Sequence, residues 1–322
     1  MTNVKKGRES VNQHIRIATC NFELNGNDDV ELRARLHHRL RDLKLDLLMR
    51  QEMIGFGVSG RDSQAWLDSQ TALGMKGELG PGMGATALYW APKVFTPRRN
   101  WANEVGTRWE MPPTTLSLEL TGTTIPIVCC SHHHVYDNPV RRESEANWLT
   151  RLNDKTVTLK KRRIVLPCIV GGDTNSYPEP GTPGDVPLPR LDVPDSHPLA
   201  IRNEPHRNHR SRLIIPGQPR VLDIWPDNNL REAGLEDAAR HLATVPDRET
   251  DRARILAPTV DAYPTHGPAT RIDRIYLSRK LLPAVADVEV INMREYSDHH
   301  TVVVSLDRAV LISILADLAV AA

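Results

Sequence analysis

The stretch that most constrains this 322-residue chain is Cys168-Ile169-Val170-Gly171-Gly172-Asp173-Thr174-Asn175. The run from Ile164 to Val170 is almost continuously apolar, which is typical of a strand buried on both faces. Two glycines follow, and we expect them to let the backbone turn sharply and approach a ligand closely. Asp173 and Asn175 are two residues apart, so in an extended chain their side chains point to the same side. The stretch predicts either a plain turn with an Asx hydrogen bond or a site for a cation or a phosphate oxygen.

Strands that end in polar residues also occur near the start of the chain. Ile15 to Cys20 predicts a short strand that ends at Asn21. Leucines at helical spacing over residues 32–47 predict a helix. The apolar run Leu45 to Met49 then predicts a buried strand, which ends in Arg50-Gln51-Glu52. The order is strand, helix, strand, with polar side chains at the strand ends.

The middle of the chain repeats this pattern. Residues 116–120 and 125–130 flank a Thr-Gly-Thr sequence and predict a hairpin. Its second strand runs into three consecutive histidines, His132 to His134. A helix is expected to begin after Pro139.

A strand predicted over residues 272–277 carries an acid on its apolar side. Asp273 has the parity of the apolar residues in this strand, so its carboxylate should face the core. Burial of a carboxylate is costly unless a cation or a histidine compensates it. His299, just before the last predicted strand at 301–306, supplies such a partner.

A proline-rich segment follows the stretch that ends at Asn175. Residues 177–220 hold ten of the 24 prolines and a basic cluster from His206 to Arg212. A long stretch without periodicity predicts either a functional loop or a disordered insertion. Beyond it, residues 230–241 predict a helix with an internal Gly234.

Composition limits the classes of function. The chain has 41 Lys and Arg against 40 Asp and Glu, so its net charge of +1 gives no overall attraction to nucleic acid. The first 14 residues lack the apolar core of a secretory signal, and the apolar stretch 309–316 is too short to span a membrane. We therefore expect a cytoplasmic enzyme or binding protein. Reduced core thiols, not a disulfide framework or a zinc site, are expected for the four cysteines, Cys20, Cys129, Cys130 and Cys168.

The polar residues at the strand ends suit the hydrolysis of phosphate esters. Mg²⁺ prefers carboxylate, amide and water oxygens, which Asp, Glu and Asn side chains provide. A histidine oriented by a carboxylate is the usual acid or base near neutral pH. Amides such as Asn21 and Asn175 can hold phosphate oxygens without adding negative charge.

These residues, in this order, resemble the motif set of the endonuclease/exonuclease/phosphatase superfamily, which includes pancreatic deoxyribonuclease. The resemblance implies a deoxyribonuclease-I-like fold of the α/β (α+β) class, a two-sheet β-sandwich flanked by helices. It extends from about residue 15 to residue 306 and rests on these motifs: Asn21, Gln51-Glu52, the strand that ends near His133, Gly171-Gly172-Asp173-Thr174-Asn175, Arg271-Ile272-Asp273 and Ser297-Asp298-His299.

The resemblance implies a metal site. Glu52 would be the principal ligand of Mg²⁺ (or Mn²⁺), with Asn21 and Asp298 beside the metal. Glu23 stands where some members of the family have an Asp, and it would serve as an outer ligand or as a ligand of a second metal.

The resemblance also implies a catalytic group. Asp273 would orient His299, which activates the attacking water, while Asp173 and Asn175 position the water and the phosphate. The resemblance leaves open whether Asp173 or His299 takes the proton, so we treat them as a coupled pair.

The third catalytic element implied is a histidine that stabilises the phosphate oxyanion or protonates the leaving group. Family strands usually end in a single histidine, whereas this strand offers three. Strand length favours His133, with His132 as the next choice. The tryptophan pair that apurinic-site enzymes place before the Ile-Asp motif is absent, and Tyr263-Pro264-Thr265-His266 stands there.

We predict a single domain over residues 15–308, preceded by a flexible segment, 1–14, and followed by an apolar tail, 309–322. The favoured function is a nuclease, because the arginine-rich residues 33–41, the basic cluster 160–163 and the insertion at 177–220 offer local basic groups for phosphate backbones. In the insertion, the candidate substrate-binding residues are Arg207, Arg210 and Arg212. A phosphatase or phosphodiesterase acting on small soluble or lipid phosphate esters is the alternative, and an inactive binding module is the third.

Overall fold

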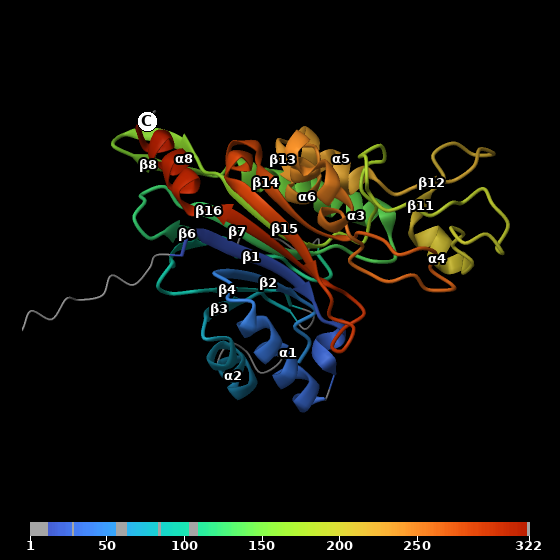
Figure 1. Cartoon of the computed structure of the whole chain (residues 1–322), viewed down its shortest axis with the longest axis horizontal. Coiled ribbons are helices and arrows are strands. Elements are labelled where there is room, and N and C mark those ends of the chain that lie inside the picture. The colour runs from blue at the N-terminus through green and yellow to red at the C-terminus, as the bar shows by residue number, and fades with distance from the viewer. Residues whose placement is uncertain (1–11, 28, 56–62, 83–84, 103–108, 321–322) are drawn as a thin grey trace, which may run out of the picture.

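Two mixed β-sheets lie face to face in the computed structural model, which describes residues 12–27, 29–55, 63–82, 85–102 and 109–320 (Figure 1). The first sheet has the order β15 (Val285–Ile291), β16 (Thr301–Asp307), β1 (His14–Asn21), β2 (Leu47–Gln51), β4 (Ala87–Trp90), β3 (Lys76–Leu79). The second has the order β13 (Leu235–Asp237), β14 (Asp273–Ser278), β10 (Cys168–Asp173), β7 (Ile127–His133), β6 (Thr114–Leu120), β5 (Phe95–Asn100).

Alternation along the strands explains the layers. In β1, Ile15 and Ile17 pack in the core between the sheets, whereas Ala18 and Cys20 face outward. The outer face of the first sheet is covered by α1 (Val30–Asp42) and α2 (Gln64–Leu73), and that of the second by α3 (Pro139–Thr150), α5 (Trp225–Glu232) and α6 (Ala238–Ala243) (Figure 1). The predicted two-sheet sandwich flanked by helices is confirmed.

The apolar run at 164–170 divides into two strands. The edge strand β9 (Arg162–Val165) pairs with β8 (Thr156–Leu159), and Leu166 and Pro167 separate it from β10. Proline cannot donate to a strand ladder, so the long strand is interrupted there. The central strand of the second sheet is therefore β10 alone, and all six of its residues are buried.

Gly171 and Gly172 lie inside β10, so the sharp turn predicted at these glycines is wrong. Their role is close packing within the protein. A Cβ on Gly172 would lie 1.8 Å from the carbonyl oxygen of His132 on the neighbouring strand. A Cβ on Gly171 would lie 2.5 Å from Cε of Met49 in the opposite sheet.

The helix predicted over 230–241 is also wrong. Helix α5 ends at Glu232, β13 follows, and α6 begins at Ala238. Gly234 has a φ of +83°, a left-handed conformation that ends α5 and that residues with a side chain rarely adopt. The glycine breaks the helix, and the chain between the two helices adds a strand to the second sheet.

The proline-rich segment 177–220 lies within the described residues and contains little regular secondary structure. It contains α4 (Glu204–His209) and β11 (Ser211–Arg212), which pairs with β12 (Val221–Leu222), and it projects beyond the sheets (Figure 1). Buried ion pairs attach its ends to the domain. Arg271 contacts Asp185 at 2.9 Å, and Asp223 accepts from both Arg142 at 2.7 Å and Arg212 at 3.2 Å.

The remaining parts complete the chain. Helix α7 (Arg252–Ile255) packs near β15, and the predicted apolar tail forms helix α8 (Arg308–Val320), whose Leu311 and Leu315 are buried.

None of the described helices is long and apolar enough to cross a membrane. All four cysteines are buried and free, as expected. Of the segment predicted to be flexible, residues 1–11 lie outside the described residues.

We expect Gly172→Ala to destabilise the fold by more than about 3 kcal/mol, because the new methyl group overlaps a backbone oxygen that cannot move without separating β7 from β10. The measurement is urea unfolding followed by circular dichroism. Gly74→Asn is the matched control, because Gly74 has a φ of +67° and open space around it. Asparagine tolerates that conformation, so its cost should stay below about 1 kcal/mol. Equal stabilities for the two variants would contradict this role of Gly172.

Candidate active site

The strand ends that carry polar residues meet at one edge of the sandwich. Strands β1 and β2 run parallel, with Asn21 opposite Gln51, so Asn21 and Glu52 lie at the same end of the first sheet. In the second sheet Asp173 is aligned with His133 on one side and with Asp273 on the other. This register places groups from both sheets at the same edge, where the sequence analysis expected a site.

Four of these side chains contact one another across the two sheets. Asn21 Nδ2 lies 3.1 Å from Glu52 Oε1 and 3.3 Å from Asp173 Oδ2. His133 Nε2 lies 3.3 Å from the same Glu52 oxygen and 3.6 Å from the same Asp173 oxygen. Two nitrogen donors are thus shared by two carboxylates.

This arrangement keeps Glu52 ionised. Burial alone would raise the pKa of the Glu52 carboxylate, but His133, the Leu24 amide and Asn21 outweigh burial and lower the pKa to about 2. The Leu24 N–H donates to Oε2 at 2.7 Å. For His133 the signs are reversed: burial alone would lower the pKa, but Glu52 and Asp173 outweigh burial and raise the pKa above its ordinary value. The site therefore holds an anionic Glu52, and the two carboxylates favour the protonated form of His133.

The backbone at Glu52 is strained. Its φ is +55°, a conformation that costs free energy for a residue with a side chain. The residue follows directly after β2, and its carboxylate is turned to the donors described above. Such strain is retained where the surrounding structure requires it, and here it accompanies a polar cluster.

Asp273 and His299 form the second half of the site. His299 Nδ1 donates to Asp273 Oδ2 at 2.8 Å, and His299 Nε2 lies 3.9 Å from Asp173 Oδ2. Burial alone would lower the pKa of His299, but Asp273, Asp173 and Asp298 raise it to about 10. The pairing expected from the parity of Asp273 is present, and it fixes the ring so that Nε2 faces Asp173.

Asn175 lies on the chain directly after Asp173, with a φ of +47°. Its backbone N–H donates to Asp173 Oδ1 at 2.7 Å, which is the Asx turn that the sequence offered as one alternative. Its side-chain amide donates to the carbonyl oxygen of His134 at 2.9 Å. In this structure Asn175 therefore braces Asp173, and its amide nitrogen is directed to the backbone.

The run of three histidines divides by strand alternation. His133 reaches the two carboxylates, whereas His132 and His134 point to the other face, where their rings stack with centroids 4.5 Å apart. Both ring nitrogens of His132 are buried without a hydrogen-bond partner in the described part of the chain. Burial lowers the pKa of His132 to about 3, so it is a neutral core residue. His133 thus lies beside Glu52 and Asp173, whereas His132 lies on the opposite face of β7.

The oxygen donors near Asn21 suit a hard divalent cation. Asn21 Oδ1 is buried and has no hydrogen-bond partner among the described residues, although the nitrogen of the same amide contacts two carboxylates. Ser297 Oγ lies 3.2 Å from both the Asn21 carbonyl oxygen and Asp298 Oδ1, so Asp298 stands beside Asn21. Its side chain is 58% exposed and available to a ligand. Glu52, Asn21 and Asp298 thus offer the oxygens that Mg²⁺ or Mn²⁺ requires.

A second arrangement of metal-binding type occurs in the described part of the chain. Ligand atoms of Asp173, Asp273 and His299 lie within 4.8 Å of one another. Because Asp273 and His299 already form a 2.8 Å hydrogen bond, a cation bound there would have to replace the shared proton. The oxygen group around Asn21 requires no such exchange.

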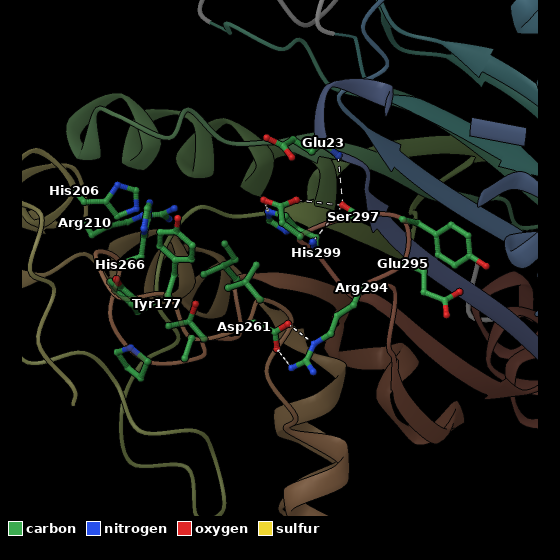
Figure 2. A pocket seen from close by; sticks show the side chains of 18 residues that line it. Glu23, Tyr177, His206, Arg210, Asp261, His266, Arg294, Glu295, Ser297 and His299 are labelled. Atoms are coloured by element: carbon green, nitrogen blue, oxygen red, sulfur yellow. Dashed lines mark hydrogen bonds and ion pairs between the residues drawn. The ribbon is translucent and has the colours of Figure 1, made fainter. Parts of the chain in front are cut away.

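A pocket of about 780 Å³ opens beside His299 (Figure 2). Glu23, Ser297 and Asp298 line it on the side of the site, and the pKa of Glu23 is raised by the charge of Asp298. Several lining residues were not identified as site residues from the sequence: Tyr177, His206, Asp261 and His266. His266 lies in the segment that stands where apurinic-site enzymes have tryptophans, and this difference was the available signal.

The three arginines expected to bind substrate have different surroundings. Arg210 lines the pocket, and its Nη1 donates to the carbonyl oxygen of Asn175 at 2.6 Å. Arg212 contacts Glu143 at 2.5 Å and also Asp223, and it does not line the pocket. Arg207 lies 3.2 Å from Asp195, also outside the pocket lining.

Comparisons with known proteins bear on the family and the fold of this chain. Residues 18–299 match the Endonuclease/Exonuclease/phosphatase family. Comparison with curated protein sequences gives no significant match. Among solved structures, an AP endonuclease from Archaeoglobus fulgidus is similar, with 18% identity, a TM-score of 0.55, and coverage of 91% of this chain and 99% of that one.

Two further structures show the same fold. A 3'-5' exonuclease (NExo) from Neisseria meningitidis has 15% identity and a TM-score of 0.55, covering 91% of this chain and 100% of that one. Danio rerio TDP2 complexed with a single-strand DNA product has 15% identity and a TM-score of 0.54, covering 91% and 99%. At these identities the likeness concerns the fold.

We expect His133→Asn to lower kcat by about 10²-fold to 10⁴-fold on a minimal phosphodiester, because it removes the imidazole donor that lies between Glu52 and Asp173. The same substitution at His132 should leave kcat within about threefold for the folded fraction, since that ring faces the other side of β7. Steady-state kinetics on bis-p-nitrophenyl phosphate, with circular dichroism to establish folding, provide the measurement. The reverse order of effects would assign the catalytic histidine to position 132.

Proposed function

Because this chain belongs to the endonuclease/exonuclease/phosphatase family of phosphoric ester hydrolases, we propose that it is a Mg²⁺-dependent phosphodiesterase that hydrolyses nucleic acid. The observation that carries the proposal is the meeting of Glu52, Asn21, His133 and Asp173 across the two sheets. We assign the activity to a single domain, residues 15–308. The buried free cysteines support a cytoplasmic location, because such usage is typical of a reducing compartment.

In the proposed site, Glu52, Asn21 and Asp298 would hold the metal. A bound Mg²⁺ would act as a Lewis acid on the scissile phosphate and neutralise part of its charge. The unpartnered Asn21 Oδ1 and the ionised Glu52 support this assignment. Glu23, which lines the pocket next to these residues, would serve as an outer ligand.

Asp173 and His299 would position the attacking water. The 3.9 Å between Asp173 Oδ2 and His299 Nε2 is a gap that one water molecule can bridge. Asp273 holds the His299 ring in place through Nδ1, and the Asn175 N–H holds Asp173 through Oδ1. The pKa of His299 is raised to about 10, so its ring already carries a proton on each nitrogen at neutral pH. Within this coupled pair, the Asp173 carboxylate would therefore accept the proton of the water.

His133 would stabilise the negative charge that develops on the phosphate. Glu52 and Asp173 raise the pKa of His133 against the effect of burial, which favours the protonated ring. A preorganised donor of this kind is typically worth two or three orders of magnitude in rate. Leu24, which the sequence analysis did not identify, contributes through its backbone N–H by orienting Glu52.

Nucleic acid is the substrate we favour, because the similar structures include an AP endonuclease, an exonuclease and a protein bound to a single-strand DNA product. A small soluble phosphate ester is the second candidate. It is supported by the 780 Å³ pocket, whose volume is typical of sites for small molecules. An inactive module is the least favoured, since each catalytic position of the motif set is filled.

We expect hydrolysis of plasmid DNA and of bis-p-nitrophenyl phosphate to stop in a chelator and to return with Mg²⁺ or Mn²⁺. Glu52→Gln should lower metal-dependent turnover by more than about 100-fold, because a removed ligand costs more than a removed orienting group. Glu249→Gln is the matched control, since this exposed residue lies in a different part of the domain and contacts Arg252. Chelator-resistant hydrolysis, or full activity of Glu52→Gln, would contradict the proposed function.

The dependence of substrate affinity on salt separates the two substrate classes. A nucleic acid that makes several phosphate contacts should lose affinity steeply with increasing salt, whereas a small ester should lose little. Turnover of inositol phosphates with no turnover of DNA or RNA would replace the nuclease with the second candidate.

A further inference from the structure

The pocket beside His299 has two chemically different ends. Glu23, Asp298 and His299 belong to the proposed reaction site, whereas His206, Arg210 and His266 gather at the other end (Figure 2). The second group comes from segments that the catalytic motifs do not include, α4 and its C-terminal neighbour Arg210 together with the loop at 260–268. Its function is not explained by the chemistry assigned to the site.

We propose that Arg210, His206 and His266 form an anion subsite that binds a second, non-scissile phosphate of the substrate. The proposal rests on the proposed function, because it places that phosphate next to the phosphodiester undergoing hydrolysis. It identifies the substrate class as a phosphodiester with a neighbouring phosphate, such as a nucleotide unit that carries phosphates on both sides.

Arg210 carries a charge that no carboxylate compensates in the described part of the chain. Its Nη1 donates to the Asn175 carbonyl oxygen at 2.6 Å, which is a neutral acceptor. A guanidinium has five N–H donors, so this bond leaves a fork available to the two oxygens of a phosphate. The other pocket arginine, Arg294, differs because it forms an ion pair with Asp261 at 2.5 Å.

The two histidines supply neutral donors beside this charge. Their rings stand edge to face with centroids 3.5 Å apart, and the Tyr263 ring packs against His266 at 5.1 Å. Burial and the nearby Arg210 lower the pKa of His206 to about 3, and the same two causes lower the pKa of His266. The imidazoles are therefore uncharged at neutral pH, and each has one N–H. Thr265 Oγ1 lies 2.7 Å from His266 Nδ1, so when the Thr265 hydroxyl donates to Nδ1, the Nε2–H of His266 can donate to an anion.

The position of Arg210 connects the subsite to the reaction site. The carbonyl group that it holds belongs to Asn175, whose N–H holds Asp173. An anion on Arg210 would therefore lie near the chain segment that positions the attacking water. Arg207 and Arg212 are excluded from this subsite, because carboxylates already contact them and neither lines the pocket.

Calorimetric binding of thymidine 3',5'-bisphosphate and of the 3'- and 5'-monophosphates tests the subsite without requiring turnover. The wild-type protein should bind the bisphosphate at least about tenfold more tightly than either monophosphate. This difference is expected when the guanidinium group of Arg210 donates two charge-assisted hydrogen bonds to the second phosphate. Arg210→Gln should remove most of this preference, and Arg210→Lys should retain part of it. The exposed Arg202 is on the same segment outside the pocket, and Arg202→Gln should retain the full preference.

Two further measurements separate the possible failures. Hydrolysis of bis-p-nitrophenyl phosphate, which has no second phosphate, should keep its kcat in Arg202→Gln, and its kcat in Arg210→Gln measures any effect of Arg210 on the reaction site. If that kcat falls, Arg210 also acts through Asn175, and the double variant His206→Gln/His266→Gln then decides the subsite by its bisphosphate preference. Equal affinity of the wild-type protein for all three nucleotides, or a preference unchanged in Arg210→Gln and in the double variant, would overturn the subsite. A protein that prefers the bisphosphate but hydrolyses no phosphodiester would keep the subsite and lose the proposed function.

Discussion

The site depends on two carboxylates from opposite sheets that share two nitrogen donors. Glu52 and Asp173 would repel each other and would each lose hydration on burial. Asn21 Nδ2 and His133 Nε2 lie between them and offset both costs. The strained backbone of Glu52 is consistent with this interaction, since the conformation is held by contacts that the carboxylate makes with Leu24, Asn21 and His133. Removal of either donor would therefore disturb the whole edge of the sandwich.

The fold makes this interaction possible because each sheet contains a pair of parallel strands that end at the same edge of the sandwich. Strands β1 and β2 end together in the first sheet, as do β7 and β10 in the second. Gly172 permits the second pairing, because any side chain there would overlap the His132 carbonyl group. Asp273 enters from an antiparallel strand, and its bond to His299 connects the second sheet to the segment that leads into β16 of the first. The residues proposed to bind the metal and those proposed to position the water thus lie next to each other but form separate contacts.

Local sequence patterns predicted the strands and the residues at their ends, because alternation and polar termination are properties of a few consecutive residues. The parity of Asp273 even predicted its histidine partner. Strand length favoured His133 over His132, but the position of each ring depends on which face of β7 meets the first sheet. Arg212 forms ion pairs with Glu143 and Asp223, which lie 69 and 11 residues away in the sequence. Local sequence patterns could therefore not predict that the Arg212 side chain is already paired within the protein. The helix expected at 230–241 failed at Gly234, where a single left-handed residue outweighs the surrounding helical pattern.

We propose that the oxygen group of Asn21, Glu52 and Asp298 binds the divalent cation, while Asp273 and His299 retain their hydrogen bond. Anomalous diffraction from crystals soaked in Mn²⁺ tests this most directly, because it locates the metal independently of activity. We predict an anomalous peak with Glu52 and Asn21 Oδ1 among its ligands and an intact contact between His299 Nδ1 and Asp273 Oδ2. A peak ligated by Asp173, Asp273 and His299, with that hydrogen bond broken, would contradict the account.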